Sequence, residues 1–148
     1  MIARGTIADL DELAAMERAT FDGSVAIKRR QWRYHLSKNP LATVLVIRSG
    51  GRILADAVMF RRHDRARATV RIYSLAVAED HRGKGLGRRL FEECVRVSRE
   101  SGVRAAALEV SVENELAIKL YESVGFVKTA LMKDFYEPGD AWKMWITF

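Results

Sequence analysis

The sequence predicts an α+β protein with one mixed, mainly antiparallel sheet and helices packed on its faces. Apolar residues recur at helical spacing in four segments, and short runs rich in β-branched and aromatic residues lie between them. From about residue 70, a strand, a helix and a second strand follow one another. That order implies a right-handed crossover between parallel neighbours, so the sheet must be mixed.

Composition predicts a soluble protein that is folded throughout. The chain of 148 residues fits a single domain, 1–148, with 49% hydrophobic and 30% charged residues. It shows no secretion signal and no apolar window of membrane-spanning length, so we expect a cytoplasmic location and no membrane partner. A net charge of +6 favours phosphate-bearing ligands or acidic partners.

Two helices are predicted in the N-terminal part of the chain. Residues 7–21 place Leu10 and Leu13 at helical spacing. Residues 26–40 form a second, basic helical segment that should stop before Pro40, where helices tend to end.

Residues 42–80 are expected to form three strands of an antiparallel meander. Gly50 and Gly51 would make its first turn and residues 63–67 its second. The charge run at 61–67 is most simply a solvated hairpin tip.

A helix with one apolar stripe should follow, and then a buried strand at 103–112. The stripe consists of Leu86, Leu90, Cys94 and Val97. The position of Cys94 on it favours a buried core thiol over a nucleophile.

The C-terminal part should form a helix and a final pair of strands. Residues 114–124 set apolar side chains on one helical face, and Gly125 ends that helix. Residues 126–136 and 141–148 would then form the strand pair.

A basic turn with three glycines at alternate positions, EDHRGKGLGRRLFEEC at 79–94, joins a predicted strand to a helix. Its backbone amides and the positive end of the helix would converge on an anion such as phosphate. The P-loop pattern is absent, and Arg88 stands where the dinucleotide fingerprint needs glycine. The alternative is a tight turn whose glycines serve only chain geometry.

A second motif, LEVSVENELAIKLYESVGF, occupies residues 108–126. Together the two stretches resemble the GNAT superfamily of N-acetyltransferases over about residues 70–148. The acetyl-CoA loop of that family, Arg or Gln, x, x, Gly, x, Gly or Ala, corresponds to Arg82, Gly85 and Gly87. The later family pattern falls on Asn114, Ala117, Tyr121, Gly125 and Phe126. The resemblance implies a GNAT-like fold and acetyl-CoA as co-substrate.

Within the superfamily, LEVSVEN and KDFYEPGDAWKM are most similar to ribosomal-protein N-terminal (alanine) acetyltransferases and their uncharacterised bacterial relatives. Ser111 and Glu113 depart from that pattern, which usually has arginine and a small polar residue there, so the departure leaves peptide specificity open. By similarity, Phe135, Tyr136 and Asp140 would shape the acceptor site. Packing within the hairpin is the alternative for the two aromatic residues.

The resemblance implies that backbone amides of residues 82–88 cradle the CoA pyrophosphate and that strand residues 75–77 bind pantetheine. A backbone N–H near Leu75 or Ala76 would steady the thioester oxygen. The implied cofactor-binding residues are Leu75, Ala76, Val77, Arg82, Gly83, Lys84, Gly85, Leu86, Gly87, Arg88, Asn114, Ala117 and Tyr121. The side chains of Lys84, Arg88 and Arg89 would either contact phosphate or simply be solvated. Asn114 would contact the cofactor, cap its helix, or do both.

Acetyl transfer requires a neutral amine, whereas the pKa of a lysine amine is about 10.4 and that of an α-amine about 7.7 to 8.0. Glu109 corresponds to the general base of related enzymes, with a paired structural carboxylate as the alternative. Tyr121 corresponds to the general acid that protonates the CoA thiolate, with a core aromatic as the alternative.

The implied function is an N-acetyltransferase that moves an acetyl group directly from acetyl-CoA to a primary amine, which is a protein N-terminus, a lysine or a small molecule. The alternative is a non-catalytic module that senses acyl-CoA or binds nucleic acid. A nucleic-acid-binding module would use the basic run 61–67 and Lys28, Arg29, Arg30 and Arg33. No base-stacking motif supports it, so nucleic acid is not an expected partner. A homodimer stays open, and three scattered histidines give no metal-ligand spacing.

Overall fold

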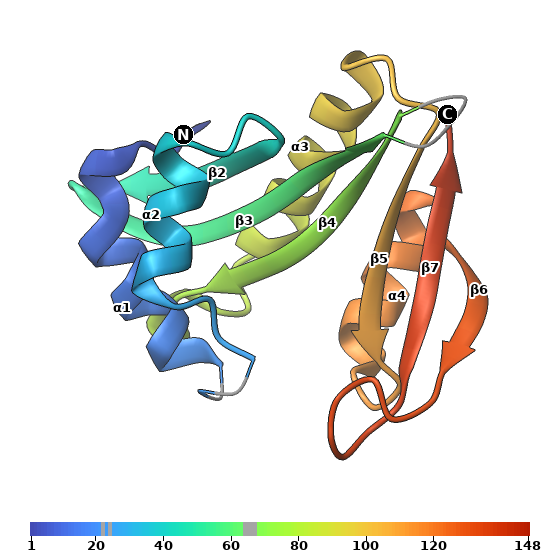
Figure 1. Ribbon diagram of the computed structural model, residues 1–148. Helices are drawn as coiled ribbons and strands as arrows, with labels where there is room; N and C mark the ends of the chain where they lie inside the picture. The colour runs from blue at the N-terminus through green and yellow to red at the C-terminus, as the bar shows by residue number, and fades with distance from the viewer. Residues whose placement is uncertain (22, 24, 64–67) are drawn as a thin grey trace.

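The computed structural model describes residues 1–21, 23, 25–63 and 68–148 (Figure 1). The elements run in the order β1 (Ile2–Arg4), the 3-10 helix η1 (Ile7–Asp9), α1 (Leu10–Thr20), α2 (Arg29–Ser37), β2 (Ala42–Ser49), β3 (Arg52–His63), β4 (Ala68–Val77), the 3-10 helix η2 (Glu79–His81), α3 (Leu86–Glu100), β5 (Ala105–Ser111), α4 (Glu115–Val124), β6 (Val127–Met132) and β7 (Ala141–Thr147).

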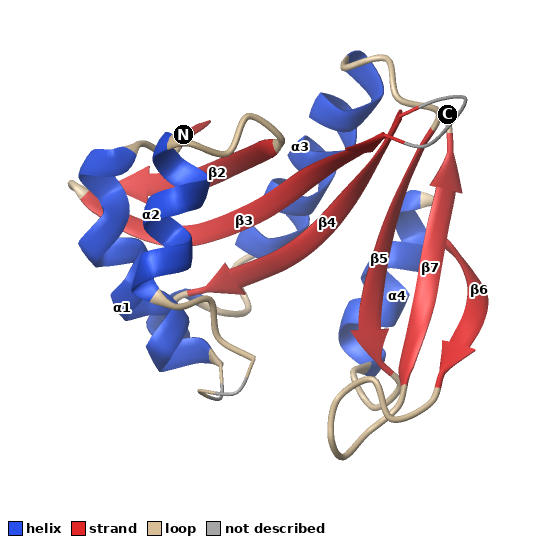
Figure 2. Ribbon diagram, viewed as in Figure 1, coloured by secondary structure: helices blue, strands red, loops and turns tan. Residues whose placement is uncertain are grey.

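One seven-stranded sheet runs through the molecule in the order β1-β2-β3-β4-β5-β7-β6 (Figure 2). Strands β4 and β5 are parallel neighbours joined through α3, whereas the other neighbouring strands are antiparallel. The predicted α+β class and the predicted crossover are therefore confirmed.

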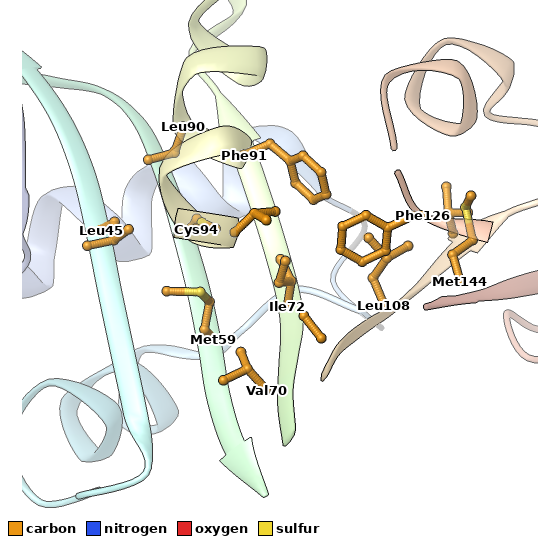
Figure 3. Close-up of a cluster of buried hydrophobic side chains, with 14 of the residues drawn as sticks. Leu45, Met59, Val70, Ile72, Leu90, Phe91, Cys94, Leu108, Phe126 and Met144 are labelled. Atoms are coloured by element: carbon orange, nitrogen blue, oxygen red, sulfur yellow. The ribbon is translucent and has the colours of Figure 1, made fainter. Parts of the chain in front are cut away.

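Helices cover both faces of this sheet, and each face has its own apolar core. Leu45 and Ile47 of β2 belong to the core beneath α3, whereas Val44 and Val46 belong to the core beneath α1 and α2. Alternate residues of a strand point to opposite faces, so one strand serves both cores. Figure 3 shows Leu90, Phe91 and Cys94 of α3 within the first of them.

Cys94 is buried, as the apolar stripe predicts. Burial, followed by the charge of Glu93, raises the pKa of its thiol to about 12, so the reactive thiolate is strongly disfavoured at neutral pH. The structure thus assigns Cys94 to the core.

Several features differ from the sequence prediction. The second helix covers Arg29–Ser37, which is shorter than the predicted segment that begins at residue 26 and stops before Pro40, and β1 was not predicted. The turn predicted at 63–67 falls mainly on residues 64–67, which lie outside the described residues. No helix in the described part of the chain is long and apolar enough to cross a membrane.

Candidate functional site

Strands β4 and β5 pair only at their beginnings. The register joins Thr69, Val70 and Arg71 to the first three residues of β5, although β4 continues to Val77. Figure 1 shows the two strands diverging beyond that point. The edge of β4 from Ile72 to Val77 therefore presents backbone N–H and C=O groups without a strand partner, and these can bind an extended ligand.

The glycine turn follows the open edge directly. Gly83 and Gly85 have φ of +78° and +80°, a backbone region that residues with a Cβ rarely adopt. Gly85 is the N-cap of α3 and provides no side-chain cap. The first amides of α3 thus lack intrahelical partners at the positive end of the helix, where an anion is favoured.

Gly87 differs from Gly83 and Gly85, because its backbone conformation does not require a glycine. Its φ is not positive, and a Cβ built there would lie 3.7 Å from Val77 Cγ2 and 3.8 Å from Leu75 Cδ2, which is ordinary contact. The fold alone would accept a side chain at this position. A side chain there would cover the surface of Leu75 and Val77, whereas the glycine leaves that surface open to a ligand. The turn therefore fits the CoA chain that the family resemblance implies.

The basic side chains of the turn differ in the contacts that they make. Arg82 Nε donates a hydrogen bond to the Val77 carbonyl at 3.1 Å and ties the turn to the end of β4. Arg88 lies 3.4 Å from Glu92 on the next helical turn. Lys84 and Arg89 are exposed and have no partner among the described residues, so they are the cations most available to phosphate.

Asn114 caps α4. Its Oδ1 accepts the backbone N–H of Ala117 at 3.2 Å, which confirms the capping role. Contact of Asn114 with the cofactor stays a prediction.

Tyr121 packs on the core and keeps its hydroxyl available. Its ring centroid lies 4.6 Å from that of Phe91. Burial raises the pKa of Tyr121 to about 12, with smaller contributions from Tyr136 and Cys94. Within the described part of the chain, its hydroxyl has no hydrogen-bond partner. Tyr121 is thus a core aromatic residue whose phenol stays protonated and free to donate.

Glu109 is paired with an arginine that sequence reasoning missed. Arg71 Nε donates to Glu109 Oε2 at 3.0 Å, and the two side chains are 21% and 12% exposed. Leu108 and Val110 belong to the core beneath α3, so Glu109 points to the opposite face of β5. The alternation of Thr69, Arg71 and Tyr73 along β4 was the available signal, because polar side chains in a strand mark its solvated face.

Tyr136, in the loop between β6 and β7, interacts electrostatically with both Glu109 and Tyr121. Burial raises the pKa of Tyr136, and the charge of Glu109 adds to the rise. Phe135 packs edge-on against Tyr136, with centroids 4.9 Å apart. Asp140 accepts the backbone N–H of Asp134 at 2.9 Å. Phe135 and Tyr136 therefore pack on each other, as the alternative for the aromatic residues expected, and Asp140 has a contact within the loop; a role of these residues in the acceptor site stays a prediction.

The candidate catalytic residues Glu109 and Tyr121 line neither of two cavities that the described residues form. A cavity of about 510 Å³ lies between α1 and η2, next to Arg82. Another, of about 290 Å³, lies between α2 and β2. Among the described residues there is also no group of three or more His, Cys, Asp or Glu residues that could hold a metal ion.

Comparison with known proteins decides the family. The model of the acetyltransferase (GNAT) family matches residues 9–126, which is most of the chain. This chain belongs to the GNAT acetyltransferase family. It is an acetyl-CoA-dependent N-acetyltransferase, with acetyl-CoA as its co-substrate. The alternative of a module that only binds acyl-CoA or nucleic acid is not favoured.

Individual relatives of this GNAT protein support the same assignment. It is 29% identical over 136 residues to the N-alpha-acetyltransferase RimI of Mycobacterium tuberculosis, covering 92% of this chain and 84% of that protein. It is 36% identical over 69 residues to the [ribosomal protein bS18]-alanine N-acetyltransferase of Escherichia coli K12, covering 47% of each chain. The structure of the NatC complex bound to Gag peptide and CoA contains a chain with a TM-score of 0.87 and 25% identity, covering 100% of this chain and 98% of that one.

Proposed function

We propose that this GNAT protein acetylates the α-amino group of a protein N-terminus and that residues 1–148 work as a single domain. The observation that carries the proposal is the placement of Glu109 and Tyr121. Glu109 lies on β5 two residues beyond the last position paired with β4, where the two strands separate, and Tyr121 lies on α4, the helix that follows β5. The similarity to an N-alpha-acetyltransferase along 92% of the chain supports an α-amine as acceptor. By the name of the Escherichia coli relative, alanine at the N-terminus of a ribosomal protein is the first candidate.

We propose that Glu109 prepares the acceptor. An α-amine with a pKa of about 7.7 to 8.0 is partly protonated at neutral pH, and the Glu109 carboxylate accepts its proton directly or through one water. The neutral nitrogen then forms a bond to the thioester carbonyl carbon, and the C=O π electron pair moves to the oxygen. The nitrogen, now positively charged, releases its extra proton to water as the intermediate collapses, which balances the proton that the thiolate takes up. A backbone N–H near Leu75 or Ala76, on the unpaired edge of β4, donates to the carbonyl oxygen as negative charge develops there.

Tyr121 completes the transfer. When the C–S bond breaks, the thiolate leaves with the electron pair and needs a proton. The Tyr121 hydroxyl is protonated and has no competing partner among the described residues, so it supplies that proton.

The proposed cofactor site combines the three segments predicted from the sequence. Amides of residues 82–88 hold the pyrophosphate, and Leu75, Ala76 and Val77 bind pantetheine along the open edge. Asn114, Ala117 and Tyr121 border the thioester end from α4. The unpaired start of α3 and the bare Cα of Gly87 support this arrangement.

An acceptor panel tests the proposed function. Initial rates of CoA thiol release are measured with acetyl-CoA and four acceptors: a peptide with a free N-terminal alanine, the same peptide with its α-amine blocked, a blocked peptide with one lysine, and free alanine. We expect turnover of the first peptide and at least tenfold lower kcat/KM for the other three. Preferred turnover of the lysine peptide or of free alanine would overturn the α-amine assignment while leaving the acetyltransferase activity intact.

A further inference from the structure

Arg71 is the side chain in direct contact with the proposed base, and no step of the mechanism above uses it. It occupies the last paired position of β4, opposite Ala107, where the two strands begin to separate. Its Nε donates to Glu109 Oε2 at 3.0 Å, and both side chains are largely shielded from solvent. A pair of this kind holds a flexible carboxylate in one orientation.

Aromatic side chains fix Arg71 in turn. Its Cζ lies 5.0 Å from the centroid of the Tyr73 ring, within range of a cation–π interaction. The Tyr73 ring lies 5.3 Å from that of Phe60, the β3 residue paired with Arg71. The guanidinium is therefore held against the same face of the sheet as Glu109.

The contact with Arg71 makes the two carboxylate oxygens of Glu109 inequivalent. Oε2 is engaged by Arg71, whereas Oε1 has no hydrogen-bond partner among the described residues. Oε1 therefore keeps all of its lone pairs for the acceptor's proton, whereas Oε2 has one engaged by Arg71. An orienting partner on one oxygen thus leaves the other oriented for proton transfer.

We propose that Arg71 is a positioning residue for acetyl transfer: by holding Glu109 Oε2, it directs Oε1 toward the acceptor amine. This inference rests on the proposed role of Glu109 as base. In this role Arg71 acts through its contact with Glu109 and not on the reacting atoms.

Lys143 provides a matched control on the other side of Glu109. It is paired directly with Glu109 in the β5–β7 register, so both side chains lie on the same face. Its Nζ lies over the Trp145 ring, 6.0 Å from the centroid, and the described residues show no ion pair between Lys143 and Glu109. Lys143→Gln therefore removes a nearby positive charge without removing the orienting contact.

The test is a set of variants assayed with acetyl-CoA and whichever amine acceptor the wild type turns over fastest. We expect Arg71→Gln to lower kcat by about 10- to 100-fold, because general base catalysis contributes about 10²- to 10⁴-fold, with the KM for acetyl-CoA unchanged within about twofold. Arg71→Lys, which keeps a charged donor, should recover part of the loss. Lys143→Gln should lose less than about threefold, since the Arg71 contact remains in place.

A double-mutant cycle separates positioning from a purely structural role. In a Glu109→Gln background, Arg71→Gln should cost less than about twofold, because no base remains to be oriented. Equal losses from Arg71→Gln with and without Glu109 would overturn the inference, as would an equal loss from Lys143→Gln. Should Arg71→Gln fail to fold, Arg71→Lys is carried through the same cycle. A wild type that prefers a lysine or a small amine would overturn the α-amine proposal, and the cycle would still test Arg71.

Discussion

At the scale of single residues, Tyr121 both packs its ring on the core and offers its hydroxyl as a proton donor. The hydroxyl can be removed while the ring stays in place. Tyr121→Phe keeps the packing on Phe91 and deletes the proton donor. We expect kcat to fall about 100-fold or more while the Kd for acetyl-CoA stays within about twofold. Steady-state kinetics and calorimetry check this, with Tyr34→Phe on the exposed side of α2 as the control. Turnover within twofold of the wild type would remove Tyr121 as the acid.

Glu17 of α1 and Asp56 of β3 are buried carboxyls whose charges interact. Glu17 is 1% exposed and Asp56 is fully buried. Glu17 Oε2 accepts the Ile27 N–H at 2.8 Å, whereas both Asp56 oxygens lack a partner in the described part of the chain. Burial raises the pKa of Glu17 to about 7, and burial together with Glu17 raises that of Asp56. Both carboxyls are thus held in the neutral form over a wider pH range than in the unfolded chain.

Stability should therefore depend on the charge of Glu17. Its folded pKa of about 7 exceeds the ordinary 4.5, so its contribution is fully present below pH 4.5 and is lost as the pH rises toward 7. At 1.36 kcal/mol per pKa unit, the loss is on the order of 3 kcal/mol. The side-chain oxygen of Glu17→Gln can still accept the Ile27 N–H. The free energy of unfolding of this variant should therefore increase relative to that of the wild type as the pH rises from 4.5 to 7. Urea unfolding at several pH values measures the difference, and a constant difference would contradict the account.

At the scale of elements, the glycine turn separates chain geometry from ligand binding. Gly85→Ala should destabilise the fold by about 1 to 2 kcal/mol, because its φ of +80° is unfavourable for alanine. Gly87→Ala meets only ordinary contacts, so we expect it to shift the unfolding free energy by less than about 0.5 kcal/mol. Its added methyl group should nevertheless weaken acetyl-CoA binding at least tenfold. Unfolding curves and calorimetry check both, and unchanged acetyl-CoA affinity in Gly87→Ala would show that the helix start is not in the cofactor site.

Local patterns predicted most elements but not all of their pairing. The 3.6-residue periodicity gave α1, α3 and α4, and Gly125 at φ +116° ends α4 as expected. The insertion of β7 between β5 and β6 was not predicted, because pairing of β5 with β7 depends on contacts far apart in sequence. Arg71 was missed for the same physical reason, since its partner Glu109 lies 38 residues away.

At the scale of the whole molecule, the seven strands form one sheet, but β4 and β5 pair only at their first residues and then separate. A ligand bound along that opening contacts both halves only in the folded state. We therefore expect acetyl-CoA at 100 times its Kd to stabilise the protein by about 2.7 kcal/mol. Thermal unfolding with NAD, ATP and duplex DNA at fixed salt as comparators measures this. A larger shift with DNA than with acetyl-CoA would contradict the expectation that nucleic acid is not a partner.

The most direct measurement is a backbone amide NMR titration with acetyl-CoA, because it locates the ligand without requiring turnover. The account predicts that the largest chemical-shift changes fall on residues 75–77 and 82–88, with further changes near Tyr121 and little change in α2. Largest changes in α2, or around the cavity between α2 and β2, would place the cofactor elsewhere and contradict the proposed site.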